Sequence, residues 1–139
     1  MAKTIDMQFM RYINLFEKIS KVSTTNCFVY NNLIVFAVPK ALVSQAIGPG
    51  AINVKRMSET LRKKIKVVTM PKDESGLKGF VEEIVEPIKI NTLELKEHVV
   101  FIAADRQSKA MLIGRNRVRE QELKDILSKT FSVRDLKIG

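Results

Sequence analysis

The sequence predicts an α+β protein that consists of two similar units in tandem. Three observations lead to this prediction. The order helix, strand, strand, helix, helix, strand occurs twice along the 139 residues. A glycine-containing turn separates the two adjacent helices in each occurrence. A polar segment rich in turn formers, residues 71–76, lies between the two occurrences. We therefore expect two domains, 1–71 and 72–139, each a three-stranded sheet packed by helices.

The first unit shows both helical and strand periodicity. Apolar residues three and four apart in residues 5–19 are typical of an amphipathic helix. Two β-rich runs flank Asn31-Asn32, a pair that tolerates positive φ, which favours a hairpin. In the helix after the glycine turn, Ile52, Met57 and Leu61 are expected to face inward. The expected elements are helices over 5–19, 41–47 and 51–63 and strands over 27–30, 33–38 and 65–70.

The second unit repeats this order. Asp105 stands where a helix N-cap is expected, because its carboxylate can accept a backbone N–H. The only histidine, His98, falls in an apolar strand and is interpreted as a sheet residue rather than a general base. The expected elements are a helix over 77–84, strands over 88–95 and 97–104, a helix from Asp105 to Gly114, a helix over 118–129 and a strand over 131–138.

Similar residues recur in the two units at a constant offset of 66 positions, from strand through both helices to the last strand. The matched positions are Ile47-Gly48 with Ile113-Gly114, Phe36-Ala37 with Ile102-Ala103, Ile52 with Val118, Leu61 with Leu127, and Val67 with Val133. Because the matches fall in four successive elements without a gap, the sequence indicates an internal duplication.

The net charge of +9 favours a polyanion as partner, because basic side chains bind phosphates with release of counterions. The charge is unevenly distributed. Residues 1–71 carry 11 Lys and Arg against 3 Asp and Glu, whereas residues 72–139 carry 13 against 12. The first unit therefore holds nearly all of the positive surplus.

Catalysis is not expected. The single cysteine, Cys27, excludes an internal disulfide and a cysteine-cluster metal site. The sequence has no Gly-x-x-x-x-Gly-Lys-Ser/Thr loop and no set of nucleophile, base and orienting group. We expect no catalytic residues, no metal and no cofactor. Its apolar runs are shorter than the roughly 18 residues of a membrane span, so we expect a cytoplasmic protein that does not bind membranes.

In each unit a helix ends at Ile-Gly and a new helix begins a few residues later. Small residues let a sugar-phosphate backbone approach the main chain closely. The N-terminus of the next helix adds N–H groups and a positive dipole end. Aliphatic side chains beside the loop can then contact unstacked bases. Two such loops in a basic chain favour phosphate binding over a purely steric role for the glycines.

Residues 47–54, Ile-Gly-Pro-Gly-Ala-Ile-Asn-Val, resemble the Ile-Gly-x-Gly-Gly-x-Asn-Val signature of KH domains. The order of elements resembles the type II, prokaryotic form of that fold, a three-stranded mixed sheet packed by helices. Two such repeats resemble the archaeal NusA-like transcription factors over essentially the whole chain. The resemblance implies tandem type II KH domains, binding of single-stranded RNA, and a role in transcription termination or antitermination with RNA polymerase.

The first loop, Gly48-Pro49-Gly50-Ala51, has alanine where the KH loop Gly-x-x-Gly has its last glycine. Alanine leaves backbone access, whereas Pro49 removes a backbone donor. We expect the loop to hold phosphates and Val54 to contact bases. The predicted RNA-binding residues of the first unit are Ile47, Gly48, Pro49, Gly50, Ala51, Asn53, Val54, Lys55, Arg56, Lys66 and Val67.

The second loop, Gly114-Arg115-Asn116-Arg117, keeps only the first glycine of the pattern. Arginine side chains are therefore expected to bind phosphates where the backbone is less accessible. The predicted RNA-binding residues of the second unit are Gly114, Arg115, Asn116, Arg117 and Arg119.

Two other functions stay open at this point. An RNA-binding protein of ribosome assembly or RNA processing would use the same groove. A protein-interaction module is the other alternative, since residues 72–97 carry four basic and seven acidic side chains and suit a basic partner.

Overall fold

The computed structural model describes residues 7–139, and residues 5 and 6 of the first predicted helix lie outside them. The chain divides into two compact units, Met1–Met70 and Pro71–Gly139. The described residues form six α-helices and two three-stranded sheets, which confirms the α+β class. None of these helices combines the length and apolar character needed to cross a membrane.

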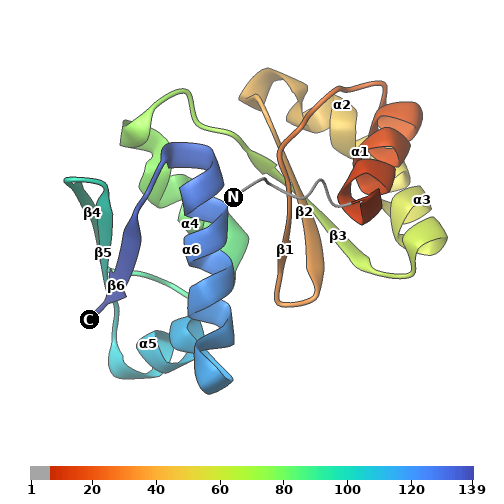
Figure 1. Cartoon of the computed structure of the whole chain (residues 1–139). Helices are drawn as coiled ribbons and strands as arrows, with labels where there is room; N and C mark the ends of the chain where they lie inside the picture. The colour runs from red at the N-terminus through yellow and green to blue at the C-terminus, as the bar shows by residue number, and fades with distance from the viewer. Residues whose placement is uncertain (1–6) are drawn as a thin grey trace. The chain divides into compact units, whose positions relative to one another are not determined.

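The sheet of the first unit has the order β1-β2-β3, with β1 antiparallel and β3 parallel to β2. Helices α1 to α3 lie together on one side of it (Figure 1). Asn31 and Asn32 form the hairpin turn with φ of 51° and 64°, as predicted. The elements are α1 (Met7–Ser20), β1 (Cys27–Tyr30), β2 (Leu33–Val38), α2 (Val43–Ile47), α3 (Ile52–Leu61) and β3 (Lys64–Thr69).

The core of the first unit lies between these helices and the sheet. Phe16 of α1 stacks on Phe36 of β2 with ring centroids 4.3 Å apart, and both side chains are fully buried. Met57 of α3 is fully buried in the same cluster, and Leu61 packs against it. Ile52 was expected to face inward, but 47% of it is exposed, so that expectation is wrong. It is the first residue of α3 and lies beside the glycine turn.

The second unit has the same topology, with β4 antiparallel and β6 parallel to β5. Asp105 caps α5 as predicted, because its Oδ1 accepts the Ser108 N–H at 2.8 Å. Figure 1 shows α4 and α6 on the same side of this sheet. The elements are α4 (Leu77–Val85), β4 (Thr92–Lys96), β5 (Val99–Ala103), α5 (Arg106–Ile113), α6 (Val118–Phe131) and β6 (Asp135–Ile138).

The predictions for the first two strands of the second unit each need a correction. Residues 88–91 precede β4 and are not a strand. His98 is not a sheet residue, because Glu97 and His98 form the turn between β4 and β5 with φ of 50° and 67°. This turn stands 66 positions after Asn31-Asn32. The duplication thus preserves the turn, although the residue types that favour it are absent.

The duplication is also not free of gaps. Phe131 ends α6 instead of opening a strand, and α6 has 14 residues where α3 has 10. Val67 pairs with Phe36, and Ile138 pairs with Ile102. Ile138 is therefore the counterpart of Val67, and Val133, buried just before β6, is not. The offset between the units grows from 66 in the helices to 71 in the last strands.

Candidate nucleic-acid interface

The first loop, Gly48–Ala51, reverses the chain between α2 and α3. Gly48 adopts φ 81° and ψ 162°, and its N–H donates to the Ser44 carbonyl at 2.9 Å. Gly50 and Ala51 both adopt left-handed backbone, with φ of 60° and 61°. The N-cap residue of α3 is Ala51, whose side chain makes no capping hydrogen bond. The loop thus carries small side chains at the start of a helix, an arrangement that suits an anion.

Asn53 has a structural role in this loop. Its Nδ2 donates to the Gln45 carbonyl at 3.1 Å, near the end of α2. A Cβ added to Gly48 would lie 2.8 Å from the same Nδ2, so only glycine allows this approach. A Cβ added to Gly50, in contrast, would have no heavy atom within 4 Å. Asn53 therefore stabilises the loop, and Gly50 opens onto free space.

The second loop, Gly114–Arg117, has the same backbone conformation. Gly114 adopts φ 74° and ψ 173°, and Asn116 and Arg117 adopt φ of 56° and 61°. Arg119 takes the place of Asn53, since a Cβ on Gly114 would lie 2.6 Å from the Arg119 Cγ. The guanidinium of Arg119 donates to the Glu122 carboxylate on the same helix. The two loops therefore share backbone geometry but differ in side chains.

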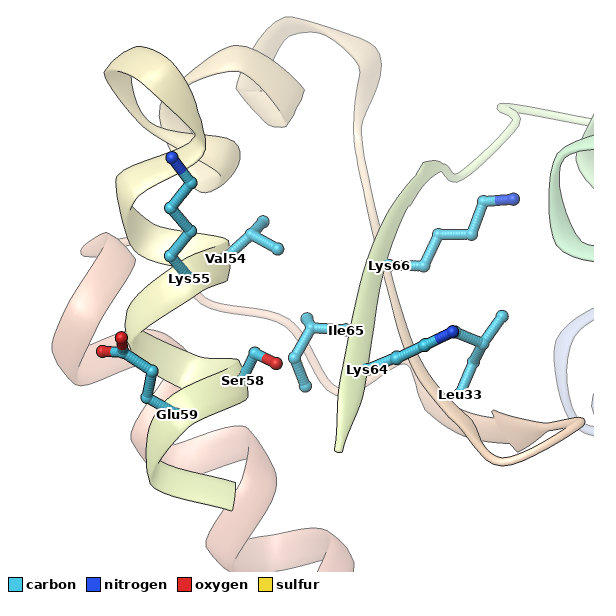
Figure 2. A pocket seen from close by; sticks show the side chains of 8 residues that line it. All are labelled: Leu33, Val54, Lys55, Ser58, Glu59, Lys64, Ile65 and Lys66. Atoms are coloured by element: carbon cyan, nitrogen blue, oxygen red, sulfur yellow. The ribbon is translucent and has the colours of Figure 1, made fainter. Parts of the chain in front are cut away.

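A groove beside the first loop runs between α3 and β3. Its volume is about 560 Å³. Figure 2 shows Val54, Ser58 and Ile65 pointing into the space between the helix and the strand, whereas Lys66 extends to the other side of β3. We call it the first groove, and it is lined by Leu33, Val54, Lys55, Ser58, Glu59, Lys64, Ile65 and Lys66.

Three of the predicted RNA-binding residues line the first groove, namely Val54, Lys55 and Lys66. Val67 packs against the core instead, and Arg56 is exposed outside the lining. Sequence reasoning missed the other five lining residues. Two of the five, Ser58 and Glu59, could have been found from helical spacing. They follow Val54 and Lys55 by four positions, and residues four apart lie on the same face of a helix.

The residues that line the first groove combine aliphatic surface with a surplus of basic side chains, of which Lys64 and Lys66 extend to the side of β3 away from α3 (Figure 2). Leu33, Val54 and Ile65 supply aliphatic surface, and three lysines exceed the single carboxylate of Glu59. The Ser58 hydroxyl donates to the Lys63 carbonyl at 2.9 Å, which leaves its oxygen as an acceptor. Such a surface suits a base against the aliphatic side chains and phosphates at the lysines.

The second unit has a groove in the corresponding place, between α6 and β6, with a volume of about 380 Å³. The charged side chains that line it form ion pairs with one another. Lys124 Nζ lies 3.5 Å from Asp135 Oδ1, and Arg117 Nη1 lies 3.5 Å from Glu120 Oε1. We call it the second groove, and it is lined by Arg117, Glu120, Gln121, Lys124, Asp135, Leu136, Lys137 and Ile138.

Two side chains have shifted pKa values that bear on chemistry. The N–H of Leu136, followed by Lys124 and Lys137, lowers the pKa of Asp135, so this carboxylate is ionised at neutral pH. Burial raises the pKa of Cys27 to about 12, so its thiol is not a nucleophile at neutral pH. Residues 7–139 contain no group of three His, Cys, Asp or Glu side chains that could hold a metal ion.

No family model matches the chain. A probable transcription termination protein NusA from Halococcus morrhuae is 24% identical over 142 residues. The match includes 100% of this chain and 100% of that protein. The protein of that name from Methanococcus vannielii is 27% identical over 130 residues, which make up 91% of this chain and 73% of that protein. The predicted resemblance to archaeal NusA-like proteins is confirmed.

The chain also resembles a solved structure over nearly its full length. The crystal structure of APE1850 matches with a TM-score of 0.67 and 28% identity, over 97% of this chain and 100% of the other. A probable transcription termination protein NusA from Thermoplasma acidophilum is 21% identical over 139 residues, which make up 97% of this chain and 94% of that protein. Because these matches span nearly the full chain, the resemblance includes both units.

Proposed function

We propose that the protein is a non-enzymatic factor that binds single-stranded RNA and acts in transcription termination or antitermination. In this proposal residues 1–71 and 72–139 are tandem type II KH domains. The observation that carries it is that α3 begins where the first loop ends and lines the first groove from Val54 onward. The loop suits one or more phosphates, and the groove suits the bases that follow.

The charge and the relatives support the same function. The first unit has the large positive surplus that backbone binding needs. The curated relatives are named probable transcription termination proteins, which supports transcription rather than another RNA process. RNA polymerase is accordingly the proposed protein partner.

Fluorescence anisotropy with a short, labelled, mixed-sequence single-stranded RNA tests the RNA-binding part. The logarithm of affinity should fall linearly with the logarithm of salt concentration, with a slope near −0.7 for each phosphate neutralised. Gly50→Asp places a carboxylate in the open space of the loop and should lower affinity about tenfold or more, a loss of at least about 1.4 kcal/mol.

Gly50→Asn is the matched control. Asparagine has the same shape and also tolerates left-handed backbone, but it adds no charge. It should lower affinity less than Gly50→Asp does, because it fills the same space without adding charge. Equal affinities for all three proteins, with folding intact, would remove the first loop from the site.

A pull-down under native conditions tests the transcription part. The protein should recover RNA polymerase subunits together with RNA. Recovery of ribosomal RNA precursors without polymerase would instead favour ribosome assembly. Recovery of a basic protein without RNA would favour the protein-interaction module.

A further inference from the structure

The two grooves occupy corresponding places, but a carboxylate replaces an apolar or a basic residue at two positions of the second groove. On the helix, Glu120 stands 66 positions after Val54 and replaces apolar surface with a carboxylate. On the strand, Asp135 pairs with Val99 as Lys64 pairs with Leu33. Asp135 is thus the counterpart of Lys64 and reverses its charge.

Both carboxylates are held in place by neighbouring groups. Glu120 has only 17% of its side chain exposed and pairs with Arg117 of the second loop. Asp135 accepts the Leu136 N–H at 2.8 Å, which orients its carboxylate. Lys124 of α6 pairs with Asp135 across the second groove, and Lys137 Nζ lies 3.6 Å from its other oxygen.

These contacts change what the second groove can bind. All three basic residues of its lining, Arg117, Lys124 and Lys137, pair with carboxylates, so a phosphate would have to displace an ion pair before it met a cation. It would also lie close to one or two negative charges, and like charges within a few ångströms repel. The second groove in addition offers less apolar surface for a base, because Glu120 replaces Val54.

We propose that Glu120 and Asp135 exclude single-stranded RNA from the second groove and so restrict groove binding to the first unit. This inference rests on the proposed function, since it assigns RNA to one of two corresponding grooves. Glu120 and Asp135 are specificity-determining residues in this account, and Arg115 is left as the phosphate contact of the second loop.

A gain-of-binding experiment tests the proposal. Glu120→Val with Asp135→Lys gives the second groove the residues of the first. The pair is placed in the full chain that also carries Gly50→Asp, and affinity for a short, labelled, mixed-sequence single-stranded RNA is measured. The pair should raise RNA affinity about tenfold or more over Gly50→Asp alone, and a tenfold change corresponds to about 1.4 kcal/mol of binding free energy.

The control variant separates groove chemistry from bulk charge. Glu82→Val with Glu94→Lys makes the same change in net charge on α4 and β4, outside the second groove, at side chains that are 43% and 63% exposed. It should raise affinity much less than the groove pair. Equal gains for the two pairs, or no gain for the groove pair, would overturn the proposal.

A second pair of substitutions and a comparison with the wild type complete the test. Glu120→Gln with Asp135→Asn preserves side-chain shape and should give a smaller gain in the same direction, with folding checked by circular dichroism. If the wild type and Gly50→Asp bind equally weakly, the proposed function fails at the first loop. A gain confined to the groove pair would even then support the exclusion by Glu120 and Asp135.

Discussion

The first and second loops share a backbone, whereas the first and second grooves share only a position. Gly48 and Gly114 differ by only 7° in φ, and the left-handed residues that follow them match as closely. The grooves beside them, in contrast, exchange Val54 for Glu120 and Lys64 for Asp135. The duplicated unit therefore keeps the turn between its helices, while in our proposal two side chains of the groove determine what it can bind. The predictions below probe this comparison from the largest effect to the smallest.

The largest effect concerns the core residues that hold the two loop helices. Met57 of α3 and Leu123 of α6 stand 66 positions apart, and both are fully buried. Met57→Ala and Leu123→Ala should each lower the free energy of unfolding by about 2–5 kcal/mol, because each leaves a cavity. Hydrogen exchange read separately for each unit should show faster exchange in the unit that carries the substitution.

Exposed residues of the same helices serve as controls. Thr60→Ala and Ser128→Ala should change stability by no more than about 0.5 kcal/mol. Similar costs for the buried and exposed positions would contradict the equivalent packing of α3 and α6.

The glycines of the loops should give the next largest effect. Gly48→Ala and Gly114→Ala combine left-handed backbone with close contacts, to Asn53 Nδ2 at 2.8 Å and to Arg119 Cγ at 2.6 Å. Each should cost about 1–3 kcal/mol in urea unfolding. Gly50→Ala faces no close contact and should cost only about 1 kcal/mol. Equal costs at the three positions would show that backbone strain alone, and not side-chain contact, requires the first glycine of each loop.

Converting the first groove into a copy of the second should weaken RNA binding. Val54→Glu with Lys64→Asp should lower RNA affinity about tenfold, a loss near 1.4 kcal/mol, because two carboxylates then face the phosphates. Anisotropy against the same labelled RNA measures the change. Ser23→Glu with Lys18→Asp makes the same change in net charge at exposed positions of the first unit and should have a clearly smaller effect. An equal loss of RNA affinity in the control would show that net charge, and not the residues of the groove, determines binding.

The smallest effect is a pH dependence that only the second groove should show. The folded-state pKa of Asp135 lies below its ordinary value of 3.8, chiefly because of the Leu136 N–H and then Lys124 and Lys137. Its ionised form therefore stabilises the fold above that value, and the contribution is lost as pH falls through the lowered pKa. In urea unfolding, the stability difference between wild type and Asp135→Asn should be constant near neutral pH and shrink in acid. A stability difference that grows as pH falls would contradict the stabilising role of the ionised Asp135.

The sequence predicted the parts of the fold that depend on local chemistry. The Asn31-Asn32 hairpin, the Asp105 cap and the ends of the helices at both glycines all follow from residues adjacent in sequence. The end of α6 does not. Phe131 of α6 lies against Phe80 of α4 with ring centroids 5.7 Å apart, and this tertiary contact favours helix where the residue types also suit a strand.

The candidate site was predicted to a similar extent and for the same reason. Residues of the first loop share a short motif, so the sequence locates them together. The first groove also needs Leu33, Ser58 and Lys64, which come from three elements and meet only through the β2–β3 register. Arg119 stays a predicted phosphate contact, and its ion pair with Glu122, which forms across one helical turn, becomes evident only in the structure.

Mapping the RNA contact residue by residue tests the central difference between the grooves most directly. Amide chemical shifts of the isotope-labelled full chain are followed by NMR as the single-stranded RNA is added. The account predicts that shifts concentrate in the first loop, the first turn of α3 and residues 64–66 of β3, with only the Arg115 region responding in the second unit. Shifts concentrated on α6 and β6 around Glu120 and Asp135, with the first groove silent, would contradict it.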